Sequence, residues 1–322
     1  MRSIHLSVLG VLYMRVFIDG RQGTTGLKIY DRLKQRSDIQ ILNIKESLRK
    51  DPKEKHKIMQ ESDIIFLCLP DDAARESVQL AKDCNAKIID TSTAHRTNEN
   101  FSYGFAELSK EHFKGIQENK YIAVPGCHAS GFIALVYPLI RQGILPKDYP
   151  FSMFSLTGYS GGGKKMIKQY EEQSKDILLN SPGIYATAQQ HKHLKEMKAV
   201  TGISSFPIFL PTVGDFYSGM LVSVPIYTSM LEKKVTLENI NEIFMQHYKD
   251  DPVVKAELPE NDSMLYANAM ANKDSMQVFA LGNDERIVLY ALYDNLGKGA
   301  SGAAIECMNI ASGIDKTKGL IL

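Results

Sequence analysis

The sequence has no tryptophan and only four cysteines, and no two of these cysteines form a CxxC pair. Widely spaced cysteines predict neither a zinc site nor a disulfide framework, so we expect no metal. They fit a reducing compartment, and we therefore expect a cytoplasmic protein. The four residues are Cys68, Cys84, Cys127 and Cys307.

The chain also has no excess of one charge and no long apolar run. Its 38 Lys and Arg residues nearly balance 37 Asp and Glu residues, and no basic run with interleaved aromatic residues predicts nucleic-acid binding. No apolar stretch reaches the roughly 20 residues that cross a bilayer. Residues 4–13 are apolar but lack an A-x-A-like cleavage site, which disfavours a signal peptide, and we assign residues 1–13 no function. We therefore expect a protein that acts on small molecules and has no nucleic-acid or membrane partner.

The N-terminal third of the chain alternates strand patterns with helix patterns. This alternation favours parallel βαβ units in a Rossmann-type sheet, whose ligands lie beyond the carboxyl ends of the strands. With 322 residues, 44% of them hydrophobic, the chain is long enough for a second domain. Strands are predicted at 14–19, 39–44, 64–69 and 87–90.

The pattern changes from residue 122 onward, where longer and less regular connections join the strands. An apolar helix is predicted at 129–141, and a long helix runs from the glycine-rich turn at 160–163 to about residue 180. We therefore predict an α/β protein in which a Rossmann-type parallel-sheet domain is followed by an α+β domain. The expected division is 1–126 plus about 298–322 for the first domain, and 127–297 for the second, catalytic and oligomerisation domain.

A glycine-rich turn follows the first predicted strand. Gly20, Gly23 and Gly26 have the spacing GxxGxxG, and Thr24 and Thr25 lie between the last two glycines, where the next helix pattern starts. Glycines let the backbone approach a pyrophosphate closely, and free N–H groups at a helix start bind it. The turn therefore predicts a dinucleotide site, with an ordinary structural turn as the alternative.

The residues after the second predicted strand bear on the choice between NADP and NAD. Ser47, Arg49 and Lys50 offer donors to the 2′-phosphate of NADP, whereas Glu46 would favour the free ribose of NAD. A solvated charged loop is a third interpretation. We predict NADP, with contacts from Ser47 and Arg49.

Cys127 lies between a predicted strand and a predicted helix. There the helix dipole and free amide groups favour a thiolate and stabilise an oxyanion, so the position suits a nucleophile. The other three cysteines lie in apolar patterns and are interpreted as buried structural residues. A thiolate that forms an acyl intermediate needs a proton donor, for which His191 and His193 are the candidates. These two histidines cannot share one helical face, and they lack a third metal ligand nearby.

Two further segments have the composition of anion sites. Ser92 and Arg96 follow the fourth predicted strand, and the Arg96 guanidinium offers a planar fork to a phosphate. Ser160 and Gly161 open the glycine-rich turn that precedes two lysines at a helix start. A hydrogen-bonded loop and a plain turn are the respective alternatives.

Together these segments resemble the N-acetyl-gamma-glutamyl-phosphate reductase family of arginine biosynthesis, in its shorter subtype, within the superfamily that includes aspartate-semialdehyde dehydrogenase. The most specific match is Val-Pro-Gly-Cys-His-Ala-Ser-Gly at 124–131. The resemblance covers nearly the whole chain. Its further matches lie at 20–26, 90–96, 159–165, 189–193 and 295–302.

The resemblance implies NADPH-dependent reduction of an acyl phosphate to a semialdehyde, with release of phosphate and a thioester on Cys127 as the intermediate. It gives the acid/base role to His191, with His193 as the alternative. In this mechanism we expect Arg96 to assist the departure of phosphate. It also implies a Rossmann domain completed by the C-terminal helix, and a homo-oligomer, either a dimer or a tetramer. The residues implied in nicotinamide contacts are Asn295, Gly297 and Gly299.

Two features depart from the family pattern. His128 replaces the aromatic residue that is common after the nucleophile, and the segment 209–217 lacks the arginine that longer relatives have nearby. The group that holds the substrate α-carboxylate therefore stays open. Aspartate-semialdehyde dehydrogenase, with the same chemistry on a shorter substrate, is one alternative function. A non-catalytic NADPH-binding redox sensor that uses Cys127 as its switch is another, although a sensor needs neither paired histidines nor a phosphate-binding arginine.

Overall fold

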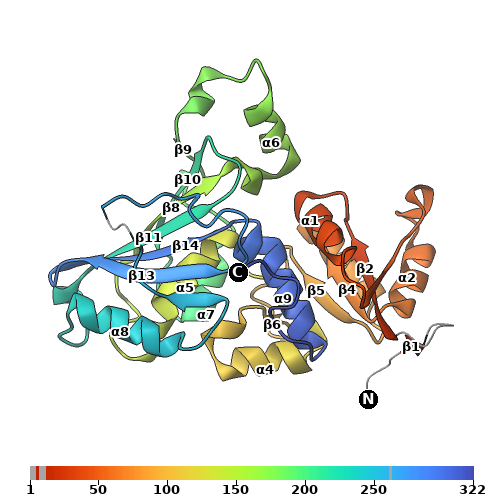
Figure 1. Ribbon diagram of the computed structural model, residues 1–322, viewed down its shortest axis with the longest axis horizontal. Helices are drawn as coiled ribbons and strands as arrows, with labels where there is room; N and C mark the ends of the chain where they lie inside the picture. The colour runs from red at the N-terminus through yellow and green to blue at the C-terminus, as the bar shows by residue number, and fades with distance from the viewer. Residues whose placement is uncertain (1–4, 7–11, 261–262) are drawn as a thin grey trace. The chain divides into compact units, whose positions relative to one another are not determined.

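The computed structural model describes residues 5–6, 12–260 and 263–322. Within these ranges the chain forms two compact units, which Figure 1 shows. Unit 1 comprises the described residues up to Ala106 together with Glu111–Val124 and Ala303–Gly319, and unit 2 comprises Glu107–Lys110, Pro125–Gly302 and Leu320–Leu322. Of the N-terminal segment to which we assign no function, residues 1–4 and 7–11 lie outside the described residues.

Unit 1 is built on a mostly parallel sheet with the strand order β1-β2-β4-β5-β7-β6, in which β3 also pairs with β2. Only the pairing of β1 with β2 is antiparallel among the described strands of this sheet. This arrangement confirms the predicted Rossmann-type sheet. The strands are β1 (His5–Leu6), β2 (Leu12–Asp19), β3 (Ile39–Leu42), β4 (Ile64–Leu67), β5 (Lys87–Asp90), β6 (Ser102–Tyr103) and β7 (Tyr121–Ala123). The helices that lie mainly in this unit are α1 (Thr24–Leu33), α2 (Pro52–Glu61), α3 (Asp71–Leu80), α4 (Lys110–Glu118) and α9 (Gly302–Ala311).

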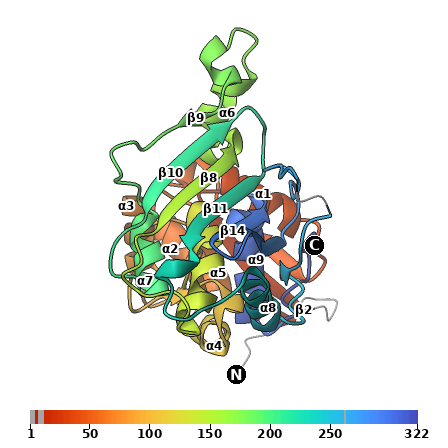
Figure 2. The ribbon, with the colours of Figure 1, turned by 90° about the vertical axis from the view of Figure 1, so that its left-hand side faces the viewer.

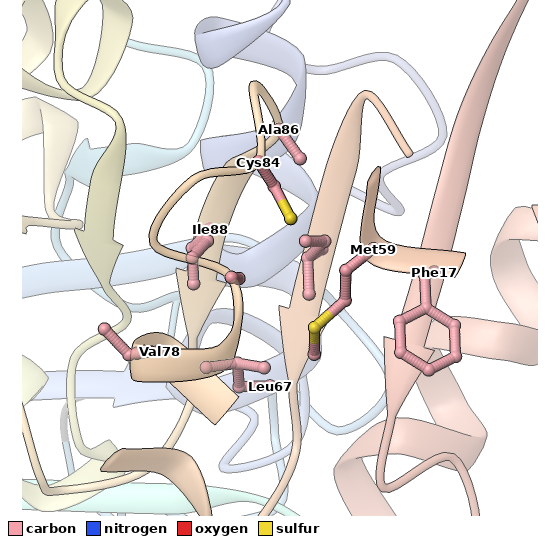
Figure 3. Packing of buried hydrophobic residues seen from close by; sticks show 9 residues of the cluster. Phe17, Met59, Leu67, Val78, Cys84, Ala86 and Ile88 are labelled. Atoms are coloured by element: carbon pink, nitrogen blue, oxygen red, sulfur yellow. The ribbon is translucent and has the colours of Figure 1, made fainter. Parts of the chain in front are cut away.

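A core of unit 1 lies between its central strands and the helices α2 and α3. All four residues of β4 are buried, as expected for an inner strand of a parallel sheet. Helix α2 begins at Pro52 because the Asp51 side chain caps it by accepting the N–H of Lys53 at 2.8 Å. The core residues labelled in Figure 3 include one from each of β2, α2, β4, α3 and β5, namely Phe17, Met59, Leu67, Val78 and Ile88.

Unit 2 is built on a mixed sheet with the strand order β12-β13-β14-β11-β8-β10-β9. The pairs β8–β10 and β12–β13 are parallel and the other pairs are antiparallel, which confirms the predicted α+β organisation. Figure 2 shows β10, β8, β11 and β14 side by side. The strands are β8 (Ser152–Gly158), β9 (Gly183–Ile184), β10 (Ile208–Gly214), β11 (Met220–Tyr227), β12 (Val254–Ala256), β13 (Met276–Gly282) and β14 (Arg286–Tyr293). The helices are α5 (Cys127–Arg141), α6 (Gly163–Glu171), α7 (Leu194–Thr201) and α8 (Leu237–His247).

Helix α5 is the central element of unit 2. Its residues from His128 to Leu139 are all buried, and it packs against β11, β14, α7 and α8. This close packing requires glycine at 131, since a Cβ at Gly131 would lie 2.6 Å from Cγ2 of Val222. The helix begins at Cys127 with Gly126 as its N-cap. The buried body of α5 therefore fixes the position of the predicted nucleophile.

The long helix predicted from the glycine-rich turn to about residue 180 is wrong. Helix α6 ends at Glu171, and Glu172 has an extended backbone. A separate 3-10 turn spans Ile177–Asn180, and the Asp176 side chain caps it by accepting the N–H of Leu178 at 2.9 Å. This local side-chain bond offers the backbone an alternative to a continued α-helix.

None of the helices in the described part of the chain combines the length and the apolar character that a membrane-spanning segment needs.

Candidate active site

Cys127 occupies the open first turn of α5. Its N-cap residue, Gly126, has no side chain that could cap the helix, and the first turn contains no acidic residue. The positive end of the helix dipole is therefore directed at the region of the thiol. Cys127 and Cys68 are partly exposed, whereas Cys84 and Cys307 are buried. Cys68 is thus not the buried residue that the sequence predicts, but only Cys127 of these two begins a helix. This combination of exposure and position suits a nucleophile.

Two side chains hold the backbone of this first turn. The Tyr293 hydroxyl donates to the carbonyl oxygen of Cys127 at 2.5 Å and accepts the N–H of Gly131 at 3.1 Å. It thus stands between two groups that would otherwise bond to each other along the helix. Glu196 of α7 accepts the N–H of Gly126 at 3.0 Å. Burial, followed by the charge of a Cys127 thiolate, raises the pKa of Tyr293 well above its usual value, so its hydroxyl keeps its proton.

His128, the residue after Cys127, is buried and bonded at both ring nitrogens. Nδ1 lies 2.7 Å from Oγ of Ser155 on β8, and Nε2 lies 2.6 Å from the Tyr185 hydroxyl. Burial, followed by the proximity of His191, lowers the pKa of His128 to about 3. The ring is therefore neutral at physiological pH, with one nitrogen donating and the other accepting. Sequence reasoning missed Ser155 and Tyr185, because neither stands near residue 127 in the chain.

The predicted acid/base residues lie against this same group. The His128 ring centroid is 5.5 Å from that of His191 and 5.6 Å from that of His193, and the latter two are 4.6 Å apart. Both histidines therefore meet the first turn of α5, together with Phe209 of β10. The structure therefore brings His128, which follows the predicted nucleophile, into one cluster with both predicted proton donors.

The local geometry distinguishes the two histidines. The backbone N–H of His193 donates to Nδ1 of His191 at 3.1 Å. A backbone N–H can only donate, so Nδ1 of His191 is an acceptor and the ring proton lies on Nε2. His193 is the N-cap residue of α7 and is 6% exposed, whereas His191 is partly exposed. His191 thus has the more accessible ring and a defined N–H.

Two segments predicted as separate binding sites are joined. Nδ2 of Asn295 donates to Oγ of Ser160 at 3.0 Å, and Oδ1 of Asn295 accepts the N–H of Gly219 at 2.9 Å. A Cβ at Gly161 would lie 3.4 Å from Nδ2 of Asn295. The side chains of Asn295 and Ser160 are both buried, and their bond fixes the glycine-rich turn against the chain after β14.

The predicted nicotinamide segment forms a π-helical turn over Gly297–Ser301, a geometry frequent at functional sites. Gly299 faces the nucleophile, because a Cβ there would lie 2.9 Å from Cβ of Cys127. Gly297 is equally constrained, since a Cβ at that position would lie 2.0 Å from the Lys273 carbonyl oxygen. Lys298 between them forms a buried ion pair with Glu107 at 2.8 Å. The turn therefore presents the backbone of Gly299 beside Cys127.

The predicted pyrophosphate turn in unit 1 has the tight geometry that glycines permit. Gly20 has a φ of +84°, and a Cβ at Gly26 would lie 2.6 Å from the Gly20 carbonyl oxygen. Helix α1 follows with Gly23 as N-cap, without a side-chain cap and without an acidic residue in its first turn. Thr24 and Thr25 are the first two helical residues. The turn and the helix start fit an anion of the pyrophosphate type.

The residues after β3 form a polar group with the pyrophosphate turn at 20–26. Arg49 pairs with Glu46 at 3.0 Å, and Nε2 of Gln22 donates to the Glu46 carboxylate at 3.1 and 3.2 Å. Arg21 donates to Oδ1 of Asn43 at 2.8 Å, and its guanidinium lies 4.5 Å from the centre of the Tyr30 ring. Ser47 is exposed beside them. Sequence reasoning missed Arg21 and Gln22, although their places inside the glycine motif could have indicated them.

Ser92 and Arg96 brace the loop after β5. Ser92 donates its hydroxyl to Oδ2 of Asp90 at 2.7 Å. Arg96 donates through Nε to the Val124 carbonyl at 2.9 Å and through Nη2 to the Thr91 carbonyl at 3.1 Å. These bonds fit the alternative interpretation of a hydrogen-bonded loop. They also hold the Arg96 guanidinium in one orientation at the carboxyl edge of the sheet, so a role toward phosphate stays a prediction.

Comparison with known proteins first identifies the class of protein to which the chain belongs. The family model described as "Semialdehyde dehydrogenase, NAD binding domain" matches residues 15–116, and the one described as "Semialdehyde dehydrogenase, dimerisation domain" matches residues 127–295. Aspartate semialdehyde dehydrogenase II from Vibrio cholerae has a TM-score of 0.68 at 14% identity, covering 92% of this chain and 98% of that chain. The enzyme from Francisella tularensis has a TM-score of 0.69 at 13% identity, covering 92% and 99%. The fold is therefore that of the semialdehyde dehydrogenases.

Closer relatives identify the family. N-acetyl-gamma-glutamyl-phosphate reductase 2 of Nostoc sp. is 42% identical over 318 residues, which cover 95% of this chain and 99% of that protein. The N-acetyl-gamma-glutamyl-phosphate reductase of Brucella ovis is 42% identical over 310 residues, which cover 93% and 99%. The chain belongs to the N-acetyl-gamma-glutamyl-phosphate reductase family, which confirms the resemblance noted in the sequence.

Proposed function

We propose that the protein reduces N-acetyl-gamma-glutamyl phosphate to N-acetyl-glutamate 5-semialdehyde in arginine biosynthesis, with NADPH as reductant and release of phosphate. The observation that carries the proposal is the position of Cys127 in the open first turn of α5, next to the cluster of His128, His191 and His193. The names of the 42% identical relatives support the choice of substrate.

The first half-reaction is an acyl transfer to Cys127. The thiolate attacks the acyl carbon, a carbon–sulfur bond forms, and the carbon–oxygen bond to phosphate breaks, so phosphate departs with the bonding electron pair. The dipole of α5 stabilises the negative charge that develops on the acyl oxygen. Arg96 and Ser92 are proposed to bind the phosphate, and Ser160 and Gly161 the remainder of the substrate. The product on the protein is a thioester.

The second half-reaction converts this thioester to the aldehyde. NADPH, when bound, supplies the hydride for this step. The Nε2–H of His191 donates to the oxygen that becomes negative as the carbonyl is reduced. The oxygen stays hydrogen-bonded to His191, which keeps its proton; collapse of this tetrahedral anion re-forms the carbon–oxygen double bond, and Cys127 leaves as a thiolate. His193 is the alternative donor.

For NADP binding we propose the pyrophosphate turn of unit 1, with Ser47 and Arg49 on the 2′-phosphate and Asn295, Gly297 and Gly299 toward the nicotinamide. The uncapped start of α1 supports the first assignment. We assign residues 1–126 with about 298–322 to cofactor binding, and 127–297 to catalysis and assembly into a dimer or tetramer. The residues of the pyrophosphate turn are Gly20, Gly23, Thr24, Thr25 and Gly26.

The charges near the turn at 160–163 support a substrate whose nitrogen is acylated. A free amino group is a cation that needs an acidic partner, whereas an acetylated nitrogen is neutral. Within 159–165 and 209–217 the only carboxylate is Asp215, and Lys175 donates to it at 2.6 Å. Glu107 is likewise paired, with Lys298. Neither of these two carboxylates therefore offers an uncompensated charge to a substrate ammonium group, and the neighbouring Glu171 carboxylate accepts the Tyr159 hydroxyl at 3.3 Å.

The test is phosphate-dependent reduction of NADP by the purified protein, with N-acetyl-glutamate semialdehyde and aspartate semialdehyde compared by kcat/KM. The extra methylene alone contributes only about 1–3 kcal/mol of discrimination, so a larger preference for the acetylated compound would come from its neutral nitrogen. A preference for aspartate semialdehyde would give the chain the activity of aspartate-semialdehyde dehydrogenase. Cofactor binding without turnover of either compound would favour the redox sensor.

A further inference from the structure

A second group of ligand-type side chains lies in unit 1. His56 of α2, together with Asp83 and Cys84 in the loop after α3, brings an imidazole nitrogen, a carboxylate oxygen and a thiol sulfur within 4.8 Å of one another. Nε2 of His56 lies 2.9 Å from Oδ1 of Asp83. No other trio of His, Cys, Asp and Glu side chains in the described ranges has this spacing.

The hydrophobic core holds these ligands in place from one side. His56 and Met59 are three residues apart and so lie on the same face of α2. Met59 is fully buried in the same core cluster as Cys84 and Val78 (Figure 3). The packing of Met59 against this cluster therefore directs the His56 face of α2 toward the loop that carries Asp83 and Cys84.

Lys120 holds the backbone of that loop. Its Nζ donates to the carbonyl oxygens of Cys84 at 2.6 Å and of Lys82 at 2.9 Å. The backbone of the loop is thus fixed by packing and by hydrogen bonds, and side-chain rotation would bring the three ligand atoms to the closer spacing that a metal ion needs. The ammonium group of Lys120 also lies near the trio, and its charge reduces the attraction of a metal ion to the site.

The three side chains become less exposed from Asp83 through His56 to Cys84. Cys84 is 4% exposed, the His56 side chain is 29% exposed, and the Asp83 side chain is 66% exposed. An ion can therefore enter from solvent, past Asp83, and reach the sulfur at the inner end. Three protein ligands leave a fourth position of a tetrahedral site for water.

We propose that His56, Asp83 and Cys84 form a binding site for a divalent cation of the zinc type. The donor set determines this choice. Calcium and magnesium prefer six or more oxygen ligands, whereas this trio offers one oxygen, one nitrogen and one sulfur, which is a zinc-like set. On binding, the Cys84 thiol releases its proton to solvent, the proton on Nε2 of His56 leaves for Nδ1 or solvent, and the metal replaces the His56–Asp83 hydrogen bond with two coordinate bonds.

The bound ion would act as a structural clip within unit 1. It would tie the middle of α2 to the loop after α3, and would add to the side-chain packing and the His56–Asp83 bond that link these segments. A ligand that binds only the folded state raises stability by mass action. The role is independent of the proposed reductase activity, which uses Cys127.

Two measurements on the full-length protein test the site, each with the metal ion alone as probe. The first is the affinity for Zn²⁺ in competition with a chromophoric chelator, and the second is the thiolate-to-metal absorption band that appears when Co²⁺ is added. One equivalent of each ion is expected to bind. His56→Ala and Asp83→Asn should each weaken Zn²⁺ binding at least about tenfold, because one of three protein ligands is lost. Cys84→Ala should abolish the absorption band.

The controls replace a histidine and a cysteine of the same chain that lie outside the proposed site. His112→Ala and Cys307→Ala should bind both ions as the unchanged protein does. His56 and Asp83 are near the surface, so their variants keep the test decisive even where Cys84→Ala unfolds. The proposal is overturned if no stoichiometric ion binds, if His56→Ala binds Zn²⁺ as well as the unchanged protein, or if Cys127→Ser alone removes the band.

Discussion

Nε2 of His128 lies 2.6 Å from the Tyr185 hydroxyl, which ties the residue after Cys127 to the segment between β9 and α7. The other ring nitrogen is bonded to Ser155, and the ring meets Phe209 edge-on at 5.2 Å. A neutral imidazole with both nitrogens satisfied packs much as an aromatic ring does. This explains how the chain accommodates histidine where the family resemblance leads one to expect an aromatic residue.

Replacing the candidate nucleophile should separate chemistry from cofactor binding. We expect Cys127→Ser to lose nearly all turnover, because a hydroxyl at this helix start is a far weaker nucleophile than a thiolate. The dissociation constant of NADPH should stay unchanged when measured by fluorescence or calorimetry. Cys307→Ser, which changes a buried cysteine of α9, is the matched control and should retain turnover. Substantial turnover by Cys127→Ser would refute the thioester mechanism.

The two histidines should differ in their effect on rate. His191→Ala should lower turnover about 10²–10⁴-fold if its Nε2–H is the proton donor. His193→Ala should affect the rate less and the stability more, because His193 is nearly buried at the start of α7. Single-turnover kinetics together with chemical unfolding would check both expectations. The assignment of His191 is wrong if His193→Ala shows the larger loss of rate at unchanged stability.

The cofactor preference should depend on the residues after β3. Ser47→Ala combined with Arg49→Ala should narrow the preference for NADPH over NADH, since charge-assisted bonds to a 2′-phosphate contribute a few kcal/mol at most, roughly 1.5–3 each. Dissociation constants for both cofactors provide the measurement. Arg49 is paired with Glu46. The dissociation constants of Arg21→Ala should therefore be measured beside those of the double variant, because Arg21 lies in the same polar group. Equal affinity of the unchanged protein for NADH would show that Glu46 binds the ribose.

Local patterns predicted much of the fold. The alternation of short apolar strands with helices predicted the parallel sheet, and the Pro-Gly-Cys turn followed by apolar residues predicted a helix that begins near Cys127. Both predictions rest on neighbours in the chain, which fix backbone conformation. The prediction of one long helix after the turn at 160–163 was wrong, although its cause is also local. The capping bond of Asp176 competes with continuation of the helix, and the sequence pattern did not reveal it.

Contacts between distant residues could not be predicted in this way. Tyr185 and Ser155 meet His128 across 57 and 27 residues, and Asn295 meets Ser160 across 135. Such pairs depend on the order of strands in the mixed sheet, which no local pattern specifies. His56 and Asp83 of unit 1, which are 27 residues apart, meet through the packing of α2 beside the loop after α3, so cysteine spacing alone predicted no zinc site.

The buried histidine also predicts how stability depends on pH. Because burial lowers the pKa of His128 to about 3, the unfolded chain binds a proton near pH 6.5 that the folded protein takes up only near pH 3. The unfolded state therefore holds more protons in this window, and His128 reduces the free energy of unfolding as pH falls from about 6.5 toward 3. One such proton contributes a slope of about 1.4 kcal/mol per pH unit at most. His128→Gln should flatten the pH dependence of the unfolding free energy in this window, as measured with chemical denaturant, whereas Tyr185→Phe keeps the buried imidazole and should retain the slope. An unchanged slope in His128→Gln would mean that the imidazole gains its proton in the folded protein as readily as in the unfolded chain.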